Sequence, residues 1–325
     1  MSAEASTRLA VTEGLIELAA ADPRVILVCM DTVTTMRAEP FGEAYPGRLF
    51  DVGIAEQHAV AFASGLASCG MMPWVAAFAG FITMRACEEV RTFVAYPHLN
   101  VKLVGANGGI AGGARDGATH QFIEDLGILR TMPGMTIVVP ADAGQTRAAV
   151  MVIGRTPGPA YIRVGSGHDP VVLPAGEPFE LGKIRILERH GDDVALFANG
   201  YVLPRALEAA RALSTIGVRA TVVEVHTLKP IDVDGIAGVL RRTGAAVTIE
   251  DHNIIGGLGS AIAEVIAEHA PAWLARIGVR DVFAESGLAG PLLDKYQMGI
   301  EDIIAAARMV VERKLSSWPR PPTAG

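Results

Sequence analysis

The stretch that decides the fold is LFDVGIAEQHAVAFASGLASCGMMPWVAAF, residues 49–78. It predicts a short strand over 49–52, a helix over 56–69 that ends before Gly70, and a buried apolar strand over 74–78. A helix that joins two strands at this spacing is typical of a crossover connection in a parallel sheet. The stretch therefore predicts an α/β fold.

The same region raises the question of a membrane span, because no charged residue lies between Glu56 and Arg85. A run of this length could cross a bilayer. It is, however, rich in Ala and Gly, and it is interrupted at Gly70 and Pro73. These interruptions indicate a helix followed by a buried strand, so we expect no membrane span.

The alternation of helix and strand continues on both sides of residues 49–78. A segment rich in Pro and Gly over 173–192 predicts a linker between a first domain, 1–172, and a second, smaller domain, 193–325, with a short Pro-rich tail after Trp318. The fold class is α/β, with two domains whose parallel-rich sheets are flanked by helices. The expected strands cover 25–30, 101–104, 135–139, 160–164, 194–197, 220–225, 246–249 and 279–283, and the expected helices cover 6–21, 83–96, 143–152, 203–214, 234–241 and 259–268.

The composition of the 325 residues excludes several classes of protein. Half of the residues are hydrophobic and 19% are charged, which excludes disorder and a disulfide scaffold. The formal net charge is −7, so no basic field attracts nucleic acid or an anionic membrane. The N-terminal residues are polar rather than those of a signal peptide, and Cys29, Cys69 and Cys87 are predicted to be reduced core thiols. We expect a cytoplasmic protein.

The first candidate for chemistry is Glu56, which stands where the strand over 49–52 leads into a helix. Ligands of parallel α/β sheets bind beyond the carboxyl ends of the strands, so a catalytic carboxyl is favoured at this place. The alternative is that Glu56 only complements the positive end of the helix dipole. His58, which follows among apolar residues, is predicted to be a core group.

The second candidate is the loop over 105–117, which contains six glycines in thirteen residues. Such a loop adopts backbone conformations closed to other residues and approaches a ligand closely. It brings Asp116, Thr119 and His120 together, and a His near neutrality exchanges protons or donates to an oxyanion. Two other readings remain, a plain connector and a metal site at Asp116 and His120, although no third ligand follows at a recognisable spacing. The loop does not have the setting of a dinucleotide fingerprint.

Two further features have both a structural and a functional interpretation. Phe78 and Phe81 lie just past a strand end, where aromatic rings either pack in the core or stack on a flat cofactor ring. Several glycines over 250–260 separate a strand from a helix and either allow close packing or bind an anion. We favour close packing for this second segment.

Taken together, these segments resemble the transketolase family of thiamine diphosphate enzymes, and specifically the C-terminal subunit of a split transketolase. The resemblance covers nearly the whole chain and rests on five blocks that occur in the family's order. They are DVGIAEQ at 51–57, the segment 78–91, DGATHQFIEDL at 116–126, VVPAD at 138–142, and the segment 250–260.

The resemblance implies roles for individual residues. Glu56 would be the carboxyl that protonates N1′ of the cofactor pyrimidine and so promotes formation of the nucleophilic ylide, while the chemistry itself belongs to the cofactor. Ile54, Phe78 and Phe81 would line the pyrimidine ring. Asp116 and His120 would contact sugar hydroxyls, with His120 carrying protons during transfer of a two-carbon ketol unit. The second domain would serve mainly in assembly.

One feature of the family is missing from the sequence. The family binds the cofactor diphosphate and its Mg²⁺ through Gly-Asp-Gly and a downstream Asn, and no Gly-Asp-Gly occurs in these 325 residues. Mg²⁺ needs carboxylate or carbonyl oxygens together with the phosphates. The resemblance therefore implies an N-terminal partner subunit that carries this motif, no metal ligand in this chain, and an α2β2 assembly.

The sequence departs from the family at positions that bear on the substrate. Asn107 stands where a His usually precedes the loop, and Ser166 stands where an Arg usually follows the Tyr-x-Arg segment of Arg163. Arg115 replaces a common acidic residue in a loop about one residue longer than usual. We expect Asn107, Arg115 and Arg163 to contact the substrate, and we expect a modified or differently charged sugar.

The resemblance leaves alternatives open. One alternative is a fragment of a deoxyxylulose-phosphate synthase, which shares the Ile-Ala-Glu-Gln-His string. Another is the β subunit of a 2-oxoacid dehydrogenase E1 component, which usually lacks the Asp-Gly-x-Thr-His block. A third reading is a catalytically inert partner that only holds the other subunit. Replacement of Glu56 distinguishes that reading, because a scaffold would retain full activity.

Overall fold

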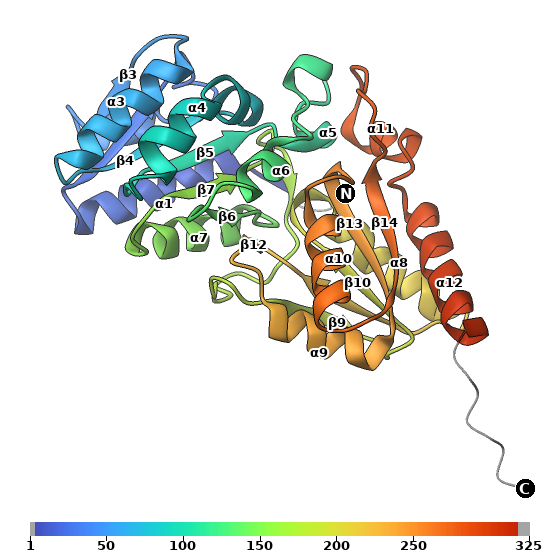
Figure 1. Ribbon diagram of the computed structural model, residues 1–325. Coiled ribbons are helices and arrows are strands. Elements are labelled where there is room, and N and C mark those ends of the chain that lie inside the picture. The colour runs from blue at the N-terminus through green and yellow to red at the C-terminus, as the bar shows by residue number, and fades with distance from the viewer. Residues whose placement is uncertain (1–3, 318–325) are drawn as a thin grey trace, which may run out of the picture.

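The first domain is built on a seven-stranded sheet (Figure 1) in the order β12-β6-β7-β5-β4-β2-β3. The computed structural model describes residues 4–317, so the Pro-rich tail after Trp318 lies outside the described residues. Every neighbouring pair in this sheet is parallel except β12 with β6. The strands are β2 (Val25–Cys29), β3 (Leu49–Asp51), β4 (Met72–Phe78), β5 (Lys102–Ala106), β6 (Thr136–Val138), β7 (Ala160–Arg163) and β12 (Thr227–Lys229).

Helices cover both faces of this sheet, as the burial of its strands requires. On one face α1 (Thr7–Ala21), α2 (Glu39–Ala44) and α7 (Ala143–Arg155) form one apolar cluster. On the other face α3 (Glu56–Ser68), the segment from 81 to 95 and α6 (Asp125–Arg130) form a second cluster. Side chains cap the N-termini of two of these helices. Ser6 accepts a hydrogen bond from Leu9 N at the start of α1, and Asp142 accepts one from Gln145 N at the start of α7.

The expected helix over 83–96 is not a regular α-helix. It consists of two π-helical turns, η1 (Phe81–Arg85) and η2 (Val90–Ala95), on either side of the short α4 (Cys87–Glu89). Such wide turns are rare and frequently occur at functional sites. The first of them carries Phe81 and Arg85, which belong to the site described below.

The second domain has a five-stranded sheet in the order β14-β13-β10-β11-β9, parallel except for β9. Its strands are β9 (Arg185–Arg189), β10 (Val194–Ala198), β11 (Ala220–Glu224), β13 (Ala245–Asn253) and β14 (Trp273–Val279). Its helices are α8 (Leu203–Thr215), α9 (Val233–Thr243), α10 (Leu258–Glu268), α11 (Ala289–Lys295) and α12 (Ile300–Ser317).

Three expectations for the second domain need correction. The strand expected over 279–283 is wrong, because β14 ends at Val279 and Asp281 turns the chain with φ +53°. The predicted linker contains β9, an antiparallel edge strand that pairs with β11. Helices α11 and α12 were not among the expected elements.

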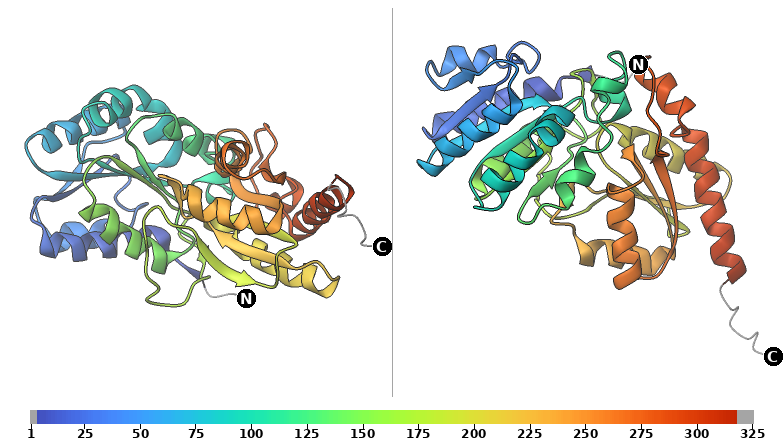
Figure 2. Two further views of the ribbon diagram at one scale, coloured as in Figure 1. Left: turned by 60° about the horizontal axis from the view of Figure 1, so that its bottom comes forward. Right: turned by 45° about the horizontal axis from the view of Figure 1, so that its top comes forward.

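The two domains are joined by more than the linker (Figure 2). β12 follows the second domain's β11 in sequence but pairs with β6 at the edge of the first sheet, where Figure 1 labels both strands. Lys229 at its end donates to the carbonyls of Arg130 at 2.8 Å and Met132 at 2.6 Å. One apolar cluster includes Leu126 and Ile137 of the first domain and Leu258 of the second. The domains therefore share a continuous core.

The uncharged run and the three cysteines can each be compared with the environment that the sequence predicted for them. The run between Glu56 and Arg85 forms α3 and β4, and no helix within residues 4–317 is long and apolar enough to cross a membrane. Cys29 is buried, which raises the pKa of its thiol to about 12. Cys69 is exposed and Cys87 is half-buried, so the expectation of a core thiol is wrong for Cys69. A cytoplasmic location stays a prediction.

Candidate active site

The candidate site lies beyond the carboxyl ends of three parallel strands of the first sheet, β5, its neighbour β4, and β3, which β2 separates from β4. β3 leads into α3 with Glu56 as its first residue, and β4 leads into η1. β5 leads into the Gly-rich loop over 105–117. This edge is where parallel α/β sheets place their ligands, because loops from adjacent strands converge there.

Glu56 is a buried carboxylate that pairs with Arg85 on η1. It is 3% exposed, and its Oε2 accepts from Arg85 Nη1 at 2.8 Å. The turn that precedes it is held by Asp51, whose Oδ1 accepts from Gly53 N at 3.0 Å. Glu56 does lie in the first turn of α3, where the helix dipole favours it, but it is also engaged across to η1. Ile54 in the same turn is 72% exposed.

Phe78 and Phe81 form one aromatic cluster with His120. The rings of Phe78 and Phe81 lie 5.8 Å apart, and each lies 5.2 Å from the His120 ring in an edge-on arrangement. Phe122 lies 5.2 Å from Phe81. His120 Nδ1 lies 3.0 Å from Thr119 Oγ1. The structure thus brings together residues from β4, η1 and the loop after β5 that are far apart in sequence.

Asp116 is exposed at the rim of the loop and is held from behind. Asn107, which is 1% exposed, donates from Nδ2 to Asp116 Oδ2 at 3.2 Å. Arg8 donates in turn to Asn107 Oδ1, and to the carbonyls of Thr35 and Gly165 at 3.1 Å each. Burial lowers the pKa of the Arg8 guanidinium below its ordinary value. Asn107 therefore reaches Asp116 directly.

A cavity of about 460 Å³ extends from this rim between the two domains. Asp116 and Arg115, both exposed, lie on its loop side, and Ser166 and Tyr201 lie on its other walls. The cavity is large enough for a small sugar. Arg115 and Asp116 thus line the same cavity.

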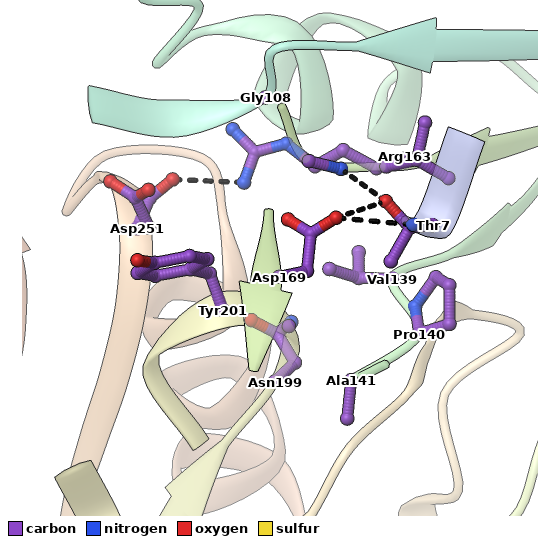
Figure 3. A pocket seen from close by; sticks show the side chains of 13 residues that line it. Thr7, Gly108, Val139, Pro140, Ala141, Arg163, Asp169, Asn199, Tyr201 and Asp251 are labelled. Atoms are coloured by element: carbon purple, nitrogen blue, oxygen red, sulfur yellow. Dashed lines mark hydrogen bonds between the residues drawn. The ribbon is translucent and has the colours of Figure 1, made fainter. Parts of the chain in front are cut away.

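Arg163 does not reach this cavity, contrary to expectation. Its guanidinium donates to both carboxylate oxygens of Asp125 at 2.9 Å, and to the carbonyls of Phe122 and Asp251 at 2.8 Å. It is 6% exposed and lines a separate cavity of about 30 Å³ (Figure 3), which has room for about one water molecule. These bonds, of which the one to Asp251 O crosses to the second domain, occupy the Arg163 guanidinium, so it is a structural group.

Two other predictions, for His58 and for the segment 250–260, have different outcomes. His58 is exposed beside the Phe62 ring, so the prediction of a core group is wrong. In the segment 250–260, the Glu250 carboxylate accepts from Leu258 N at 2.6 Å and from Gly259 N at 2.7 Å. The chain's own carboxylate thus occupies the start of α10, as the packing interpretation requires.

Sequence reasoning missed Arg8, Arg85 and Phe122. Arg85 was visible as the end of the uncharged run, but its partner Glu56 is 29 residues away. Arg8 lies in an N-terminal helix that carries no motif. Within residues 4–317, no group of three or more His, Cys, Asp or Glu side chains is placed to hold a metal ion.

Comparisons with known proteins agree with this architecture. The family model described as the transketolase pyrimidine binding domain matches residues 3–167, and the one described as the transketolase C-terminal domain matches residues 182–303. The two models correspond to the two sheets of the structure. They cover the whole candidate site.

Individual relatives have the same extent as this chain. A 6-deoxy-6-sulfo-D-fructose transketolase subunit SqwH of a Clostridium species is 40% identical over 92% of each chain. One of the subunits of an apulose-4-phosphate transketolase, from Phocaeicola vulgatus, is 35% identical over 94% of this chain and 97% of its own.

A solved structure titled a split gene transketolase, inactive beta4 tetramer, is 39% identical, with a TM-score of 0.87 over 96% of this chain and 100% of its own. Synthases of 1-deoxy-D-xylulose 5-phosphate also match, for example that of Desulforudis audaxviator with 35% identity, but the match covers 46% of that protein. The chain belongs to the transketolase family of thiamine diphosphate-dependent transferases and corresponds to its C-terminal section.

Proposed function

We propose that this chain is the C-terminal subunit of a split transketolase, which transfers a two-carbon ketol unit from a ketose to an aldose together with an N-terminal subunit. The observation that carries the proposal is the convergence of Glu56, Phe81 and His120 at one edge of the first sheet. A buried carboxylate, aromatic rings and a half-buried imidazole are the groups that this chemistry requires.

The residues present fit the pyrimidine ring of thiamine diphosphate. Phe78 and Phe81 are half-buried and offer apolar surface to a flat ring, and the exposed Ile54 lies in the turn just before Glu56. Glu56 would hold a proton at the ring nitrogen. When bound, the cofactor supplies a carbon nucleophile that accepts the ketol unit. Arg85, which now pairs with Glu56 and lies 4.4 Å from the Phe81 ring centroid, has a half-exposed side chain that is free to yield to a ligand.

His120 and Asp116 would act on the sugar. His120 is held edge-on by two phenylalanine rings, which fixes the ring's plane. An imidazole so placed moves a proton to or from a sugar hydroxyl at neutral pH. Asp116, fixed by Asn107, would accept a hydrogen bond from a second hydroxyl. Orientation of this kind accounts for much of an enzyme's rate enhancement.

The partner would supply the diphosphate and Mg²⁺ half of the site. This chain contains no Gly-Asp-Gly, and hard Mg²⁺ would be held by oxygens of that motif and the phosphates. Apolar side chains are exposed on the site-bearing elements, among them Ile54 at 72%, Met84 at 42% and Tyr96 at 86%. An α2β2 assembly would cover them.

The substrate would be a modified or differently charged sugar. Arg115 lies on the wall of the cavity beside Asp116, where it would pair with an anionic group at the far end of the sugar. The names of the two relatives give a sulfo sugar, 6-deoxy-6-sulfo-D-fructose, and a phosphorylated sugar, apulose 4-phosphate, for their transketolases. Equal activity on xylulose 5-phosphate and ribose 5-phosphate, with ordinary Michaelis constants, would contradict this part of the proposal.

The decisive experiment reconstitutes this chain with a candidate N-terminal chain that carries Gly-Asp-Gly, such as one from a neighbouring reading frame. Ketol transfer should require both chains, thiamine diphosphate and Mg²⁺, and the pair should not decarboxylate pyruvate. Decarboxylation of pyruvate would favour a synthase or an E1 component instead. Full activity of the Glu56→Ala pair would identify an inert scaffold, and turnover by this chain alone would contradict the split site.

A further inference from the structure

The Gly-rich loop that carries Asp116 and His120 packs into the core of the second domain, although it follows a strand of the first. Ile110, Ala111 and Ala114 are 5% exposed or less, and they belong to one apolar cluster with the second domain's strands. The short helix α5 (Gly109–Gly112) lies beside α11 (Figure 1). The second domain therefore surrounds the loop.

The Asp251 carboxylate is the polar centre of this contact. Its Oδ1 accepts from Ile110 N at 2.7 Å and its Oδ2 accepts from Ala111 N at 2.9 Å. Asp251 is 4% exposed and lies near the end of β13. Gly109 has φ +82°, and a Cβ there would lie 2.2 Å from Asp251 Oδ2. The backbone of the loop is thus shaped around this carboxylate.

Second-domain backbone also bonds to the chain that follows α5. Gly287 N donates to Ala114 O at 2.7 Å, and Asn253 N donates to Ile123 O at 2.9 Å. Gln121 Nε2 donates to Glu285 O at 3.0 Å. Among the described residues, Asp251 is thus the second-domain side chain that accepts hydrogen bonds from the loop backbone between Gly105 and Asp116.

The segment between Asp251's contact and the candidate catalytic residues is tight. Gly113 O accepts from Asp116 N at 3.0 Å and from Gly117 N at 3.1 Å, and Gly117 O accepts from His120 N at 2.9 Å. A Cβ on Gly113 would lie 1.8 Å from His120 O. Because these hydrogen bonds and this close approach connect residues 113–120, we expect a displacement of residues 110–111 to move Asp116 and His120 as well.

We propose that Asp251 is a positioning residue for ketol transfer, through which the second domain fixes the loop that carries Asp116 and His120. The proposal rests on the proposed function for the identity of the reaction, but the grip on the loop is independent of it. It assigns the second domain a part in catalysis beyond assembly. It also predicts a selective defect, because cofactor contacts around Glu56 do not pass through Asp251.

Glu250 provides a matched control. It is the neighbouring residue of the same strand, it is 0% exposed, and its carboxylate likewise accepts from two successive backbone N–H groups. Those groups, however, lie at the start of α10 inside the second domain. Glu250→Gln and Asp251→Asn therefore remove the same kind of contact from the same strand, and they differ in whether the loop is involved.

The first measurement is hydrogen–deuterium exchange of the isolated full chain at pH 8, above the pKa of about 7 to which burial raises Glu250. An amide side chain offers one acceptor oxygen where the carboxylate offers two. Asp251→Asn should therefore speed exchange over 110–121 at least about tenfold, whereas Glu250→Gln should speed exchange at 258–260 and leave the loop unchanged. Gly109→Ala places a Cβ against the Asp251 carboxylate and so disturbs the same contact from the loop. It should give the same exchange pattern as Asp251→Asn.

The second measurement is steady-state kinetics of the reconstituted enzyme. Asp251→Asn should lower kcat about 30- to 100-fold, as expected for misplaced catalytic groups, while the concentration of thiamine diphosphate that gives half-maximal activity changes less than about twofold. Glu250→Gln should retain most of kcat. The inference is overturned if Asp251→Asn leaves loop exchange unchanged, or if both variants lose activity equally. If wild type transfers no ketol unit, the proposed function fails, and the exchange data still decide whether Asp251 fixes the loop.

Discussion

Glu56 and His120 lie at the same edge of the first sheet but are supported in different ways. Glu56 begins α3, pairs with Arg85 on η1, and follows a turn held by Asp51, so its polar contacts all belong to the first domain. His120 ends a loop whose apolar residues lie in the second domain's core and whose backbone is bound to Asp251. The site is therefore assembled across the domain boundary.

The boundary between the two domains therefore separates the support of Glu56 from the support of His120, although both residues belong to the first domain. A change near Glu56 should impair the cofactor side of the reaction and leave the loop in place. A change at the boundary between the domains should impair the sugar side and leave the cofactor side intact. Four variants test whether the two sides of the site are supported separately.

The largest effect is expected for Glu56→Gln. The neutral amide cannot exchange a proton with the pyrimidine ring, so kcat of the reconstituted enzyme should fall by about 10²- to 10⁴-fold. Loop exchange over 110–121 should remain that of wild type. Glu88→Gln, which removes an exposed negative charge from the same layer of the domain, serves as the control and should be active. Accelerated loop exchange in Glu56→Gln would contradict the separate support of the two groups.

The second variant is Arg163→Met, which removes the buried ion-pair partner of Asp125 and one hydrogen bond between the domains. Asp125 would remain buried without its partner, and loss of one member of a buried pair costs about 3 to 5 kcal/mol. We expect unfolding in urea at a lower denaturant concentration, with a loss of at least about 3 kcal/mol. The control is Arg24→Met, since Arg24 pairs with Asp22 at 2.7 Å in an exposed position. That pair should contribute less than about 1 kcal/mol. Equal losses would contradict the structural role assigned to Arg163.

The sequence predicted what local pattern controls. The alternation of apolar strands and helices is visible within short windows, and so is the placement of Glu56 and Phe81 just after strand ends. The roles of Arg163 and Asp251 were not predictable, because their partners lie 38 and about 140 residues away and no local spacing indicates such a contact. β12 has only three residues, and its pairing with β6 of the other domain likewise depends on long-range packing.

The third variant concerns Lys102, which lies at the opposite end of β5 from the loop. Its Nζ is buried and donates to the carbonyls of Thr156 at 2.7 Å and Gly158 at 2.6 Å. A neutral amine has two N–H donors for these two acceptors. Burial lowers the pKa of Lys102 to about 7.

Above pH 7 the unfolded chain therefore carries a proton that the folded chain lacks, so the free energy of unfolding rises with pH up to the ordinary lysine pKa of about 10 and is insensitive to this group below pH 7. Between pH 7 and 9.5, wild type should gain about 3 kcal/mol more than Lys102→Met. Lys183→Met, which removes an exposed ammonium, should follow wild type. Identical pH profiles of wild type and Lys102→Met would contradict a neutral Lys102. Sugar kinetics of Lys102→Met should be unchanged at pH 8.5, because its contacts lie away from the loop.

The smallest effect is expected for Asn107→Gly. Asn107 has φ +59°, a conformation that glycine adopts without strain, so the substitution removes the amide group and keeps the backbone. Asp116 then loses the donor that connects it to Arg8, and kcat/KM for the sugar should fall about tenfold, the loss of one hydrogen bond to a charged group. Gln297→Gly is the control, because Gln297 has φ +60° and is exposed in the second domain.

Relief of backbone strain should be similar in both variants, so the kinetic difference between them isolates the bond to Asp116. The defect of Asn107→Gly should appear in the Michaelis constant for the sugar and leave the dependence on thiamine diphosphate as in wild type. A defect in cofactor dependence instead would place Asn107 with Glu56. In that case the loop and the α3 side of the site would not be independent supports, because one buried amide on the loop strand would control both.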